Sequence, residues 1–347
     1  MLIIYCGGAY LWAKSKRIPQ IIIIRWTIAL YFVLSLIYAV ILNGANILDF
    51  LMIYKCFIYI YLLSFLTNKR LMEGRHILIF YNVLLAVFFV KYLLIVALGI
   101  GTRPVVYEEN NFELMLLYAL YLVRFSITKE KYMSYLILIG AITLISLSRS
   151  SLIMYSVLVI YIFYISFKKT WVFILPFAVM AMGAVIIYIF SQRSSSLEDI
   201  DRYRFMLVFW GEVKDWSILQ WLVGAERITP LSYVACDAMS FWQSLFSFSG
   251  DGTCYSVILH SFLLRVILDH GLLGLIFMIY SAYQLLAKSN VDKWHIRVFV
   301  AIVILNGLSV SSFNNLFFAL SMVFLMTTNR YKSPLRYEDL KLNTSDN

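Results

Sequence analysis

Arginine supplies most of the positive charge in one set of polar breaks between the apolar runs of this sequence, whereas lysine is in the majority in the alternate set. A guanidinium group forms two parallel hydrogen bonds to a phosphate, but an ammonium group offers only a point charge. The first set of breaks therefore indicates binding of an anionic group such as a phosphate or pyrophosphate. Its arginines are Arg103, Arg149, Arg193, Arg202, Arg204 and Arg227, with Arg265 just beyond. The alternative is that they pair with the acidic residues of the longest break, between Asp199 and Asp237.

Arg149 stands out because it lies in a Ser-Arg-Ser-Ser segment between two apolar runs, with little other polar sequence nearby. An arginine near a membrane core is costly and therefore indicates a function. The hydroxyls of Ser148, Ser150 and Ser151 are expected to line the same polar notch.

Arg202 and Arg204 form the second candidate group, in the segment Asp201-Arg202-Tyr203-Arg204. If that segment is extended, both arginine side chains lie on one side of it. Lys91 differs from these residues because it lies inside an apolar run, where it either snorkels towards the surface or lines a cavity. With Arg103 and Arg265, Arg204 and Lys91 are the expected substrate-binding residues.

His260 opens the apolar run that follows the longest break. The run 256–286 is too long for one upright crossing, so its first turns are expected to stand above the hydrocarbon, where His260 could titrate or accept a proton. At about 100° per residue, His260, Gly271 and Gly274 share a helix face, and the glycines allow a neighbouring helix to pack closely. An interfacial or core histidine is the alternative interpretation. The adjacent Asp269-His270 is either a structural pair or a relay.

The elements that carry these residues must be membrane helices. The chain has 347 residues, of which 62% are hydrophobic and 14% charged, and its mean hydropathy is +0.82. A soluble domain carries about 25% charged residues, so lipid must solvate most of this apolar surface. The runs are continuously apolar rather than alternating, which favours helices over a barrel. The net charge of +10 punctuates the loops, as orientation signals do, and does not indicate a nucleic-acid partner.

The sequence predicts an all-α polytopic bundle of about eleven spans, because one crossing needs about 20 apolar residues. By the positive-inside rule the lysine-rich breaks face the cytoplasm. The last two runs are expected to form a hairpin around Ser309–Asn315. The predicted spans are 2–13, 21–42, 47–66, 77–99, 108–123, 132–147, 151–166, 171–190, 258–286, 297–309 and 312–328.

The one extended polar region, 192–255, is far longer than an ordinary connection and is rich in aromatic residues, which favours an ordered lid at the outer surface. The chain therefore divides into an N-terminal bundle at 1–190, a loop at 191–255, and C-terminal helices with a short tail at 256–347. Cys236 and Cys254 both lie in this loop. If the loop faces an oxidising compartment, a disulfide between them is plausible and contributes roughly 3 kcal/mol. No cysteine or histidine spacing resembles a metal site.

His260-Ser261, followed nine residues later by Gly271-Leu272-Leu273-Gly274, resembles the pattern His-[Asn/Ser/Gln]-x9-Gly-x-x-[Gly/Thr/Tyr] of the O-antigen polymerase and O-antigen ligase superfamily. The Ser-Arg-Ser turn at Arg149 and the pair at Arg202 and Arg204 are also similar to that family. The loop segment Trp221-Leu222-Val223-Gly224 is a looser match to its aromatic-to-glycine stretches. The layout of many spans, with the large loop before the last few, covers nearly the whole chain.

The resemblance implies a GT-C-like, metal-independent glycosyltransferase of the bacterial inner membrane, acting at the periplasmic face without a cofactor. Its substrate is an oligosaccharide linked to undecaprenyl pyrophosphate, and a chain-length regulator is an expected neighbour. Arg149 and Arg202 or Arg204 hold the pyrophosphate and stabilise the leaving group, and His260 assists the acceptor hydroxyl.

Three functions remain open at this point. A polymerase joins lipid-linked repeat units, and the aromatic loop and lean chain favour it. A ligase transfers the finished polymer to lipid A-core, and the histidine pattern is associated with ligases. A lipid-linked oligosaccharide flippase also gathers basic residues around a lipid pyrophosphate, but internal repeats or broken helices are typical of transporters, and the sequence shows no repeat.

Overall fold

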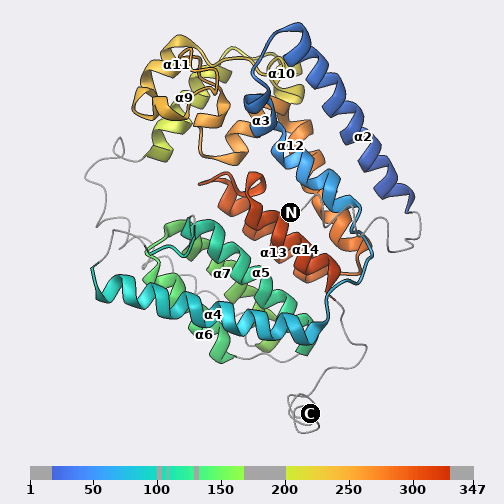
Figure 1. Ribbon diagram of the computed structural model, residues 1–347, viewed down its shortest axis with the longest axis vertical. Coiled ribbons are helices and arrows are strands. Elements are labelled where there is room, and N and C mark those ends of the chain that lie inside the picture. The colour runs from blue at the N-terminus through green and yellow to red at the C-terminus, as the bar shows by residue number, and fades with distance from the viewer. Residues whose placement is uncertain (1–17, 100–103, 108, 129–132, 168–200, 329–347) are drawn as a thin grey trace. The chain divides into compact units, whose positions relative to one another are not determined.

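The structure is a computed structural model that describes residues 18–99, 104–107, 109–128, 133–167 and 201–328 (Figure 1). These residues are almost entirely helical, and their one β-bridge joins Met72 and Thr328. The chain divides into two compact units, each assembled from three segments. Unit 1 comprises Met1–Phe65, Arg193–Leu285 and Val303–Ala319, and unit 2 comprises Leu66–Gln192, Leu286–Ile302 and Leu320–Asn347. The division into an N-terminal bundle, a loop and C-terminal helices that the sequence suggests stays a prediction.

Unit 1 begins with a pair of apolar helices. Helix α2 (Pro19–Leu36) starts at a proline, whose fixed φ suits the first helical turn, and continues as the π-helix η1 (Ile37–Leu42). Helix α3 (Ile47–Ser64) is capped by Asn46, whose side chain accepts a hydrogen bond from the backbone N–H of Leu48 at 2.8 Å. The two helices pack against each other along their apolar faces.

The long polar region forms a folded subdomain of unit 1. Its helices are α9 (Asp201–Val213), α10 (Ile218–Val223), α11 (Tyr233–Ala238), η2 (Ser240–Leu245) and η3 (Ser256–Ile258). Phe205, Phe209 and Met239 lie in a core that also takes in Leu268 of helix α12 (Phe262–Lys288). The aromatic residues thus give this region a core of its own, and the prediction of an ordered loop is confirmed for its described part.

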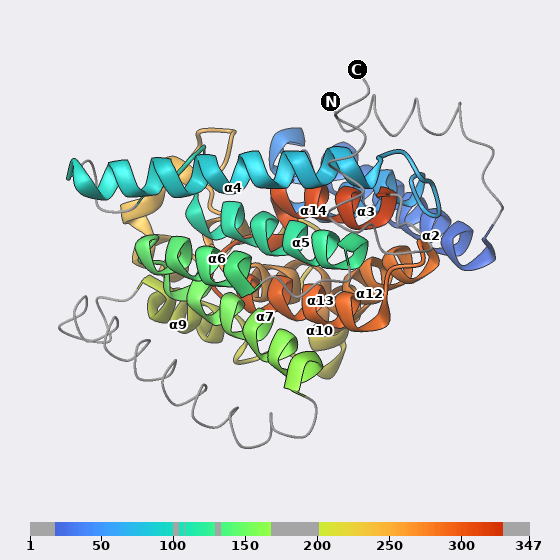
Figure 2. The same cartoon turned by 90° about the horizontal axis from the view of Figure 1, so that it is seen from below.

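Unit 2 is built around helix α5 (Asn110–Thr128), which is buried along nearly its whole length. Helices α4 (Gly74–Ala97), α6 (Met133–Ile145) and α7 (Arg149–Phe167) contact it, and Figure 2 shows α5 between α4 and α7. Because its neighbours enclose it, α5 can carry polar residues such as Glu113 and Arg124, which are 0% and 4% exposed.

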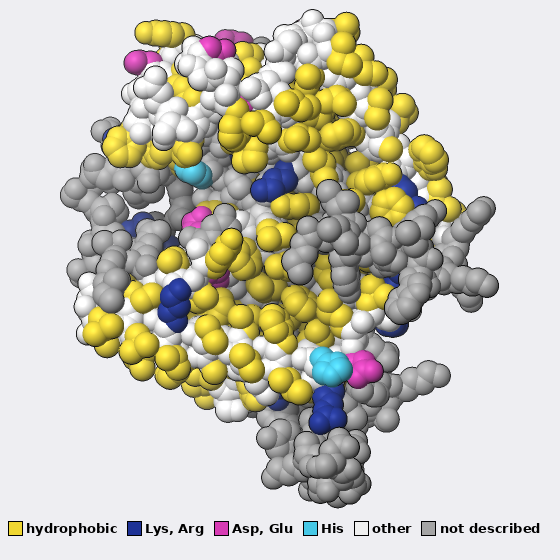
Figure 3. Space-filling view, in the orientation of Figure 1, with side chains coloured by type: hydrophobic (Ala, Val, Ile, Leu, Met, Phe, Trp, Pro, Cys, Tyr) yellow, Lys and Arg dark blue, Asp and Glu magenta, His cyan; other side chains and the backbone are white. Residues whose placement is uncertain are grey.

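Four helices in the described ranges are long and apolar enough to cross a bilayer, namely α2 with η1, α3, α4 and α12, and three shorter apolar helices are α6, α7 and α14 (Leu316–Thr327). Figure 3 shows hydrophobic side chains over most of the surface that the described residues form on that face. Exposed apolar side chains such as Ile79, Val83 and Val90 of α4 have lipid as their natural solvent. The chain is therefore an all-helical, membrane-embedded protein.

The predicted count of eleven spans stays a prediction. The expected spans 2–13 and 171–190 lie outside the described residues. The expected span 108–123 corresponds to α5, whose polar and charged residues make it less apolar than the four long helices. The expected span 297–309 corresponds to α13 (Lys293–Gly307), which is shorter than they are. The last two runs form two separate helices rather than one long one, because the short η4 (Ser312–Asn314) lies between α13 and α14. That they form a tight hairpin across the membrane stays a prediction.

Candidate functional site

Helix α12 is broken at Gly271, whose φ of 67° and ψ of −177° are not helical. A side chain at this φ is strained, and glycine avoids that strain. The break receives the loop segment after α10: a Cβ on Gly271 would overlap the carbonyl of Leu222, and one on Gly224 would lie 2.7 Å from the backbone nitrogen of His270. Gly271 therefore admits the C-terminal end of the short helix α10 and Gly224, which follows it. Gly274 lies one turn further along, where an added Cβ would meet the side chain of His270 in its own helix.

The same loop donates hydrogen bonds to backbone carbonyls near the break. Ala225 donates its N–H to the carbonyl of Leu268 at 2.8 Å. Arg227 donates from Nη1 to the carbonyl of Asp269 at 3.2 Å and to that of Val223 at 3.3 Å. A break in a membrane helix is tolerated only where its backbone groups find such partners, so loop and helix form one built junction.

Two cavities of unit 1 meet at this junction. An apolar one of about 200 Å³, here named the membrane groove, is lined by α2, α3 and α12 through Ile28, Tyr31, Phe57, Leu273 and Phe277, and by the loop through Arg227. A polar one of about 390 Å³, here named the polar pocket, lies between the turn after η1 and the loop, through Asn43, Asn46, Glu226, Arg227, Thr229 and Asp251. Among the described residues, Arg227 is the one that lines both.

The guanidinium of Arg227 is half-buried and lies 5.0 Å from the ring centre of Tyr31. No carboxylate of the described residues lies within ion-pair distance of it. Glu226 instead accepts a hydrogen bond from the hydroxyl of Tyr38 at 3.4 Å, and Asp269 accepts one from Ser256 at 2.6 Å. Arg227 therefore has donors left for an anion.

Asp251 is the acidic residue of the loop that lines the polar pocket beside Glu226. The backbone N–H of Thr253 donates to its carboxylate at 2.9 Å, and this bond, with the hydroxyls of Ser249 and Thr253, holds the pKa of Asp251 below its usual range. The carboxylate is fully exposed to solvent and ionised at neutral pH.

His270 belongs to the wall of the membrane groove. It is 4% exposed, its Nδ1 lies 2.8 Å from the hydroxyl of Tyr31, and its ring stands edge-on to Tyr54 and Phe57. An aromatic cage of this kind fixes the ring, which favours the structural interpretation of the Asp269-His270 pair.

Arg265 is buried inside unit 1 at 4% exposure, where its hydrogen bonds go to protein groups. Its Nη1 donates to the hydroxyl of Ser311 at 2.8 Å, and that hydroxyl donates to the carbonyl of His260 at 3.2 Å. Its Nη2 donates to the carbonyl of Met52 at 3.5 Å. Its charge also interacts with Asp269, one turn along the helix. Arg265 thus supports the segment that carries His260.

His260 itself precedes α12 and is not part of it, so the expected helix face shared with Gly271 and Gly274 is wrong. The helix begins at Phe262 because the backbone N–H of that residue bonds to the carbonyl of Val310, and the hydroxyl of Ser261 bonds to the carbonyl of Gly307. The ring of His260 is half-buried and lies edge-on to Phe205 of α9, with ring centres 5.3 Å apart.

Arg202 and Arg204 lie in the first turn of α9, which is helical and not extended. The extended segment considered for this pair from the sequence therefore does not form. The side chain of Arg204 is exposed. Helix α9 also carries Phe205, so this pair begins the element that packs against His260.

Arg149 is the first residue of α7, in unit 2, and its side chain is partly buried. The hydroxyls of Ser148, Ser150 and Ser151 all donate to Oδ1 of Asn111 on α5, those of Ser150 and Ser151 at 2.8 Å and 3.4 Å. The three hydroxyls therefore gather around Asn111. That they share a notch with Arg149 stays a prediction.

Lys91 lies in α4, where its ammonium donates to the carbonyl of Val106. The backbone N–H groups of Val106 and Tyr107 donate to the buried carboxylate of Glu113. Lys91 and Glu113 thus hold the segment 104–107 from both sides. Arg103, just before it, lies outside the described residues.

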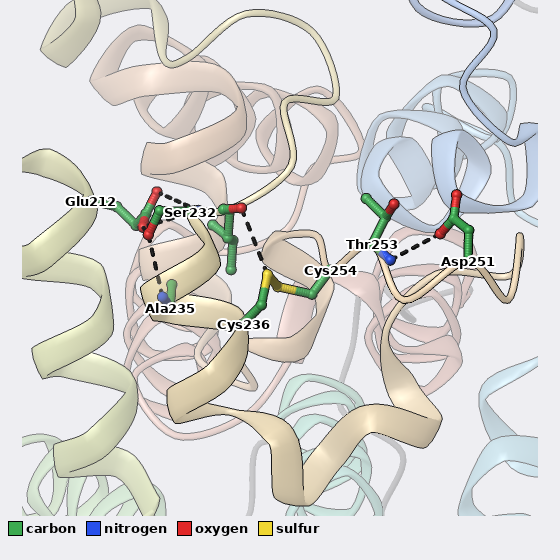
Figure 4. Close-up of a disulfide and its surroundings, with 8 residues drawn as sticks. Glu212, Ser232, Ala235, Cys236, Asp251, Thr253 and Cys254 are labelled. Carbon is green, nitrogen blue, oxygen red and sulfur yellow. Dashed lines mark hydrogen bonds between the residues drawn. A yellow bond between two sulfur atoms is a disulfide. The ribbon is translucent and has the colours of Figure 1, made fainter.

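Cys236 and Cys254 are joined by a disulfide, with Cα atoms 5.8 Å apart (Figure 4). Beside it, Glu212 of α9 accepts hydrogen bonds from the backbone and hydroxyl of Ser232, whose side chain caps α11. The loop is also fixed to α3, because Ser247 donates its hydroxyl to Asp49 at 2.5 Å. These contacts hold the loop against the helices of unit 1.

The sequence pointed to Gly271 and to the segment that ends at Gly224, but it did not single out Arg227 or the polar turn that lies beside it. Arg227 is one of several loop arginines, and only its position at the break distinguishes it. The Asn43–Asn46 turn reads as an ordinary connection, although two asparagines beside Gly44 are a usable sign of a polar turn. Asn111 had a signal, because it lies in a polar start to an apolar run.

No family model matches this chain, and neither curated proteins nor solved structures give a match.

Proposed function

We propose that this chain is a glycosyltransferase of the bacterial inner membrane, a polymerase of O-antigen or a similar surface polysaccharide. It joins repeat units carried on undecaprenyl pyrophosphate at the periplasmic face. One observation carries the proposal: His260 lies against Phe205 of α9, the helix that begins with Arg202 and Arg204. A group able to accept a proton is thus next to an element able to bind a phosphate, at the end of a membrane helix.

The proposed reaction uses these residues in two roles. An acceptor hydroxyl attacks the anomeric carbon of the donor sugar, its proton passes to the imidazole of His260, and the bond from that carbon to the pyrophosphate oxygen breaks. Arg202 and Arg204 stabilise the charge that develops on the leaving pyrophosphate, and fixed cations of this kind usually supply the largest catalytic contribution. The same role for Arg149, which the resemblance implies, stays a prediction. The bond to pyrophosphate carries the driving force.

Arg265 and Lys91, expected to bind substrate, receive other roles in this proposal. Arg265 reaches the carbonyl of His260 through Ser311, so it positions the histidine segment. Lys91 holds the connection at Val106. A chain-length regulator remains the expected partner.

Two alternatives are kept because specific features favour them. The His260 motif favours a ligase that transfers finished polymer to lipid A-core. The break in α12 favours a flippase, because broken helices are typical of transporters. In transporters the backbone groups at a break bind the substrate, whereas here Ala225 and Arg227 occupy the carbonyls of Leu268 and Asp269. The transferase interpretation is therefore preferred.

The first test is the lipopolysaccharide ladder of a strain that lacks the gene, beside the complemented strain. Core with a single repeat unit supports a polymerase. Bare core with polymer left on undecaprenyl pyrophosphate supports the ligase, and an unchanged ladder excludes both for O-antigen and directs the assay to another exported glycan. Movement of lipid-linked sugar across liposomes without bond formation supports the flippase.

A second test uses complementation by variants. We expect His260→Ala to lower product by at least about a hundredfold, the usual contribution of acid–base catalysis, and Arg149→Lys to abolish it because a bidentate contact is lost. Lys214→Ala, a change of an exposed loop cation, is the matched control and leaves the ladder intact. Full product from Arg149→Lys overturns the role given to that guanidinium.

A further inference from the structure

We infer that the junction at Arg227 is a binding site for one phosphorylated polyprenyl lipid, with the chain in the membrane groove, the phosphate on Arg227 and a sugar in the polar pocket. That the lipid chain is a polyprenyl and that it carries a sugar both rest on the proposed function. Binding of a lipid phosphate does not, because it is argued from the two cavities and Arg227.

The first argument is the order of chemistry along the two cavities. The membrane groove is walled by Ile28, Phe57 and Phe277, from helices that are apolar enough to span a bilayer. The polar pocket offers Asn46, Thr229 and other groups that can bond to hydroxyls. A ligand that fills both must be apolar at one end and polar at the other, as a lipid-linked sugar is.

The second argument is the charge at the point where the cavities meet. Arg227 lines both, and it is half-buried. Its Nη1 is used by the carbonyls of Val223 and Asp269, while Nε and Nη2 form no hydrogen bond to described residues. A guanidinium with free donors on a rigid element is suited to a phosphate. Both remaining carboxylates nearby, Glu226 and Asp269, already accept bonds from hydroxyls.

The third argument is that the site is built into the fold. The guanidinium of Arg227 donates to a backbone carbonyl of the broken helix and lies beside the ring of Tyr31. These contacts fix the position of the guanidinium. The polar pocket has about 390 Å³, which lies within the usual range of roughly 300–1,000 Å³ for small-molecule sites. The membrane groove, at about 200 Å³, takes only the first part of a long chain, and the rest lies in the bilayer.

The test is photolabelling of the purified full chain in nanodiscs with a polyprenyl phosphate that carries a diazirine near its phosphate end. We expect the label on peptides of α2, α3 or α12 around Ile28, Phe57 and Leu273. Unlabelled polyprenyl phosphate should compete, whereas polyprenol without phosphate and inorganic pyrophosphate alone should compete at least about tenfold less well. If polyprenol competes as well as polyprenyl phosphate, the site does not recognise the phosphate. If pyrophosphate alone competes fully, the site binds an anion and not a lipid. Either result overturns the inference.

Two variants and their matched controls complete the test. Arg227→Ala should weaken labelling by about tenfold or more, as loss of a charge-assisted hydrogen bond predicts. Leu273→Trp should block the membrane groove while leaving Arg227 in place, so it tests the site even if Arg227→Ala disturbs the loop. The controls are Lys214→Ala, for an exposed loop cation, and Ile276→Trp, for an exposed α12 residue outside the groove. Labelling unchanged in both test variants overturns the inference.

The sugar end is tested separately. Thr229→Ala should weaken competition by a sugar-bearing polyprenyl pyrophosphate and leave competition by bare polyprenyl phosphate unchanged. If labelling behaves as expected and the ladder test fails, the lipid site stands without the polymerase. If the ladder test succeeds and the variants label normally, the polymerase stands and its lipid binds elsewhere.

Discussion

Gly224 and Gly271 lie backbone against backbone, each with a positive φ and each without space for a Cβ. One belongs to the loop and the other to a membrane helix, so their contact joins the two elements. Every arrangement near Arg227 depends on it, because the carbonyls that hold Arg227 and Ala225 lie within three residues of this contact.

Gly271→Ala is therefore expected to separate the loop from α12. The added methyl group overlaps the carbonyl of Leu222, and the positive φ adds about 1–2 kcal/mol of strain, so we expect a loss of more than about 2 kcal/mol in stability. The measurement is the midpoint of thermal unfolding in detergent, together with trypsin cleavage of the loop. Gly211→Ala, on α9 with open space around it, is the control and should leave stability unchanged or raise it by up to about 1 kcal/mol. Equal midpoints for the two variants would contradict the backbone contact.

Removal of the disulfide is expected to loosen the loop core. The bond between Cys236 and Cys254 spans 18 residues, and the chain-entropy model gives roughly 3 kcal/mol for such a loop. The variant with both cysteines replaced by serine should lose about that much free energy of unfolding, and its midpoint of thermal unfolding should fall. Alkylation of the unfolded protein without reductant should label the buried Cys56 and leave Cys236 and Cys254 unlabelled. Free thiols at both loop positions would show that the bond does not form in the cell.

Asn111 is expected to be more important for stability than any one of its three serine partners. Asn111→Leu leaves the hydroxyls of Ser148, Ser150 and Ser151 without their shared acceptor, and an unsatisfied buried polar group costs about 1–3 kcal/mol. Each single serine-to-alanine change removes only one donor and should cost less. Thermal unfolding of the four variants gives the comparison, and a serine variant less stable than Asn111→Leu would be inconsistent with a shared acceptor.

Arg265 and Asp269 are expected to be coupled. Arg265 is buried and Asp269 is partly buried, one turn apart on α12, and their charges interact. Replacing Arg265 by methionine leaves Asp269 without its nearest cation on that helix, so we expect this variant to be less stable. The double variant Arg265→Met with Asp269→Asn should recover part of this loss. A double-mutant cycle measures the coupling, and strictly additive effects would mean that Arg227 alone balances Asp269.

The long apolar runs were predictable because one physical rule decides them. The runs 21–42, 47–66 and 77–99 contain few groups that could compete with lipid, and the structure forms helices over Pro19–Leu42, Ile47–Ser64 and Gly74–Ala97. The disulfide could also be predicted from the sequence, because two cysteines in one polar loop have few other partners.

The site was less predictable because distant residues decide it. His260 stays outside the helix since the groups around it bond to Gly307, Val310 and Ser311, nearly fifty residues away. Gly271 could be recognised as a packing glycine, but whether it admits a helix or a loop depends on Gly224. Spacing along the sequence carries no information about either contact.

The buried position of α5 has a consequence for how this protein enters its membrane. A helix that carries Glu113 and Arg124 gains little by moving alone from the translocon into lipid, because a charged residue near the middle of a span costs up to about 2.5–3.5 kcal/mol. Its polar groups are covered by α4, which is synthesised earlier, and by α6 and α7, which are synthesised later. Stable insertion of α5 therefore has to wait for helices that the ribosome has not yet made.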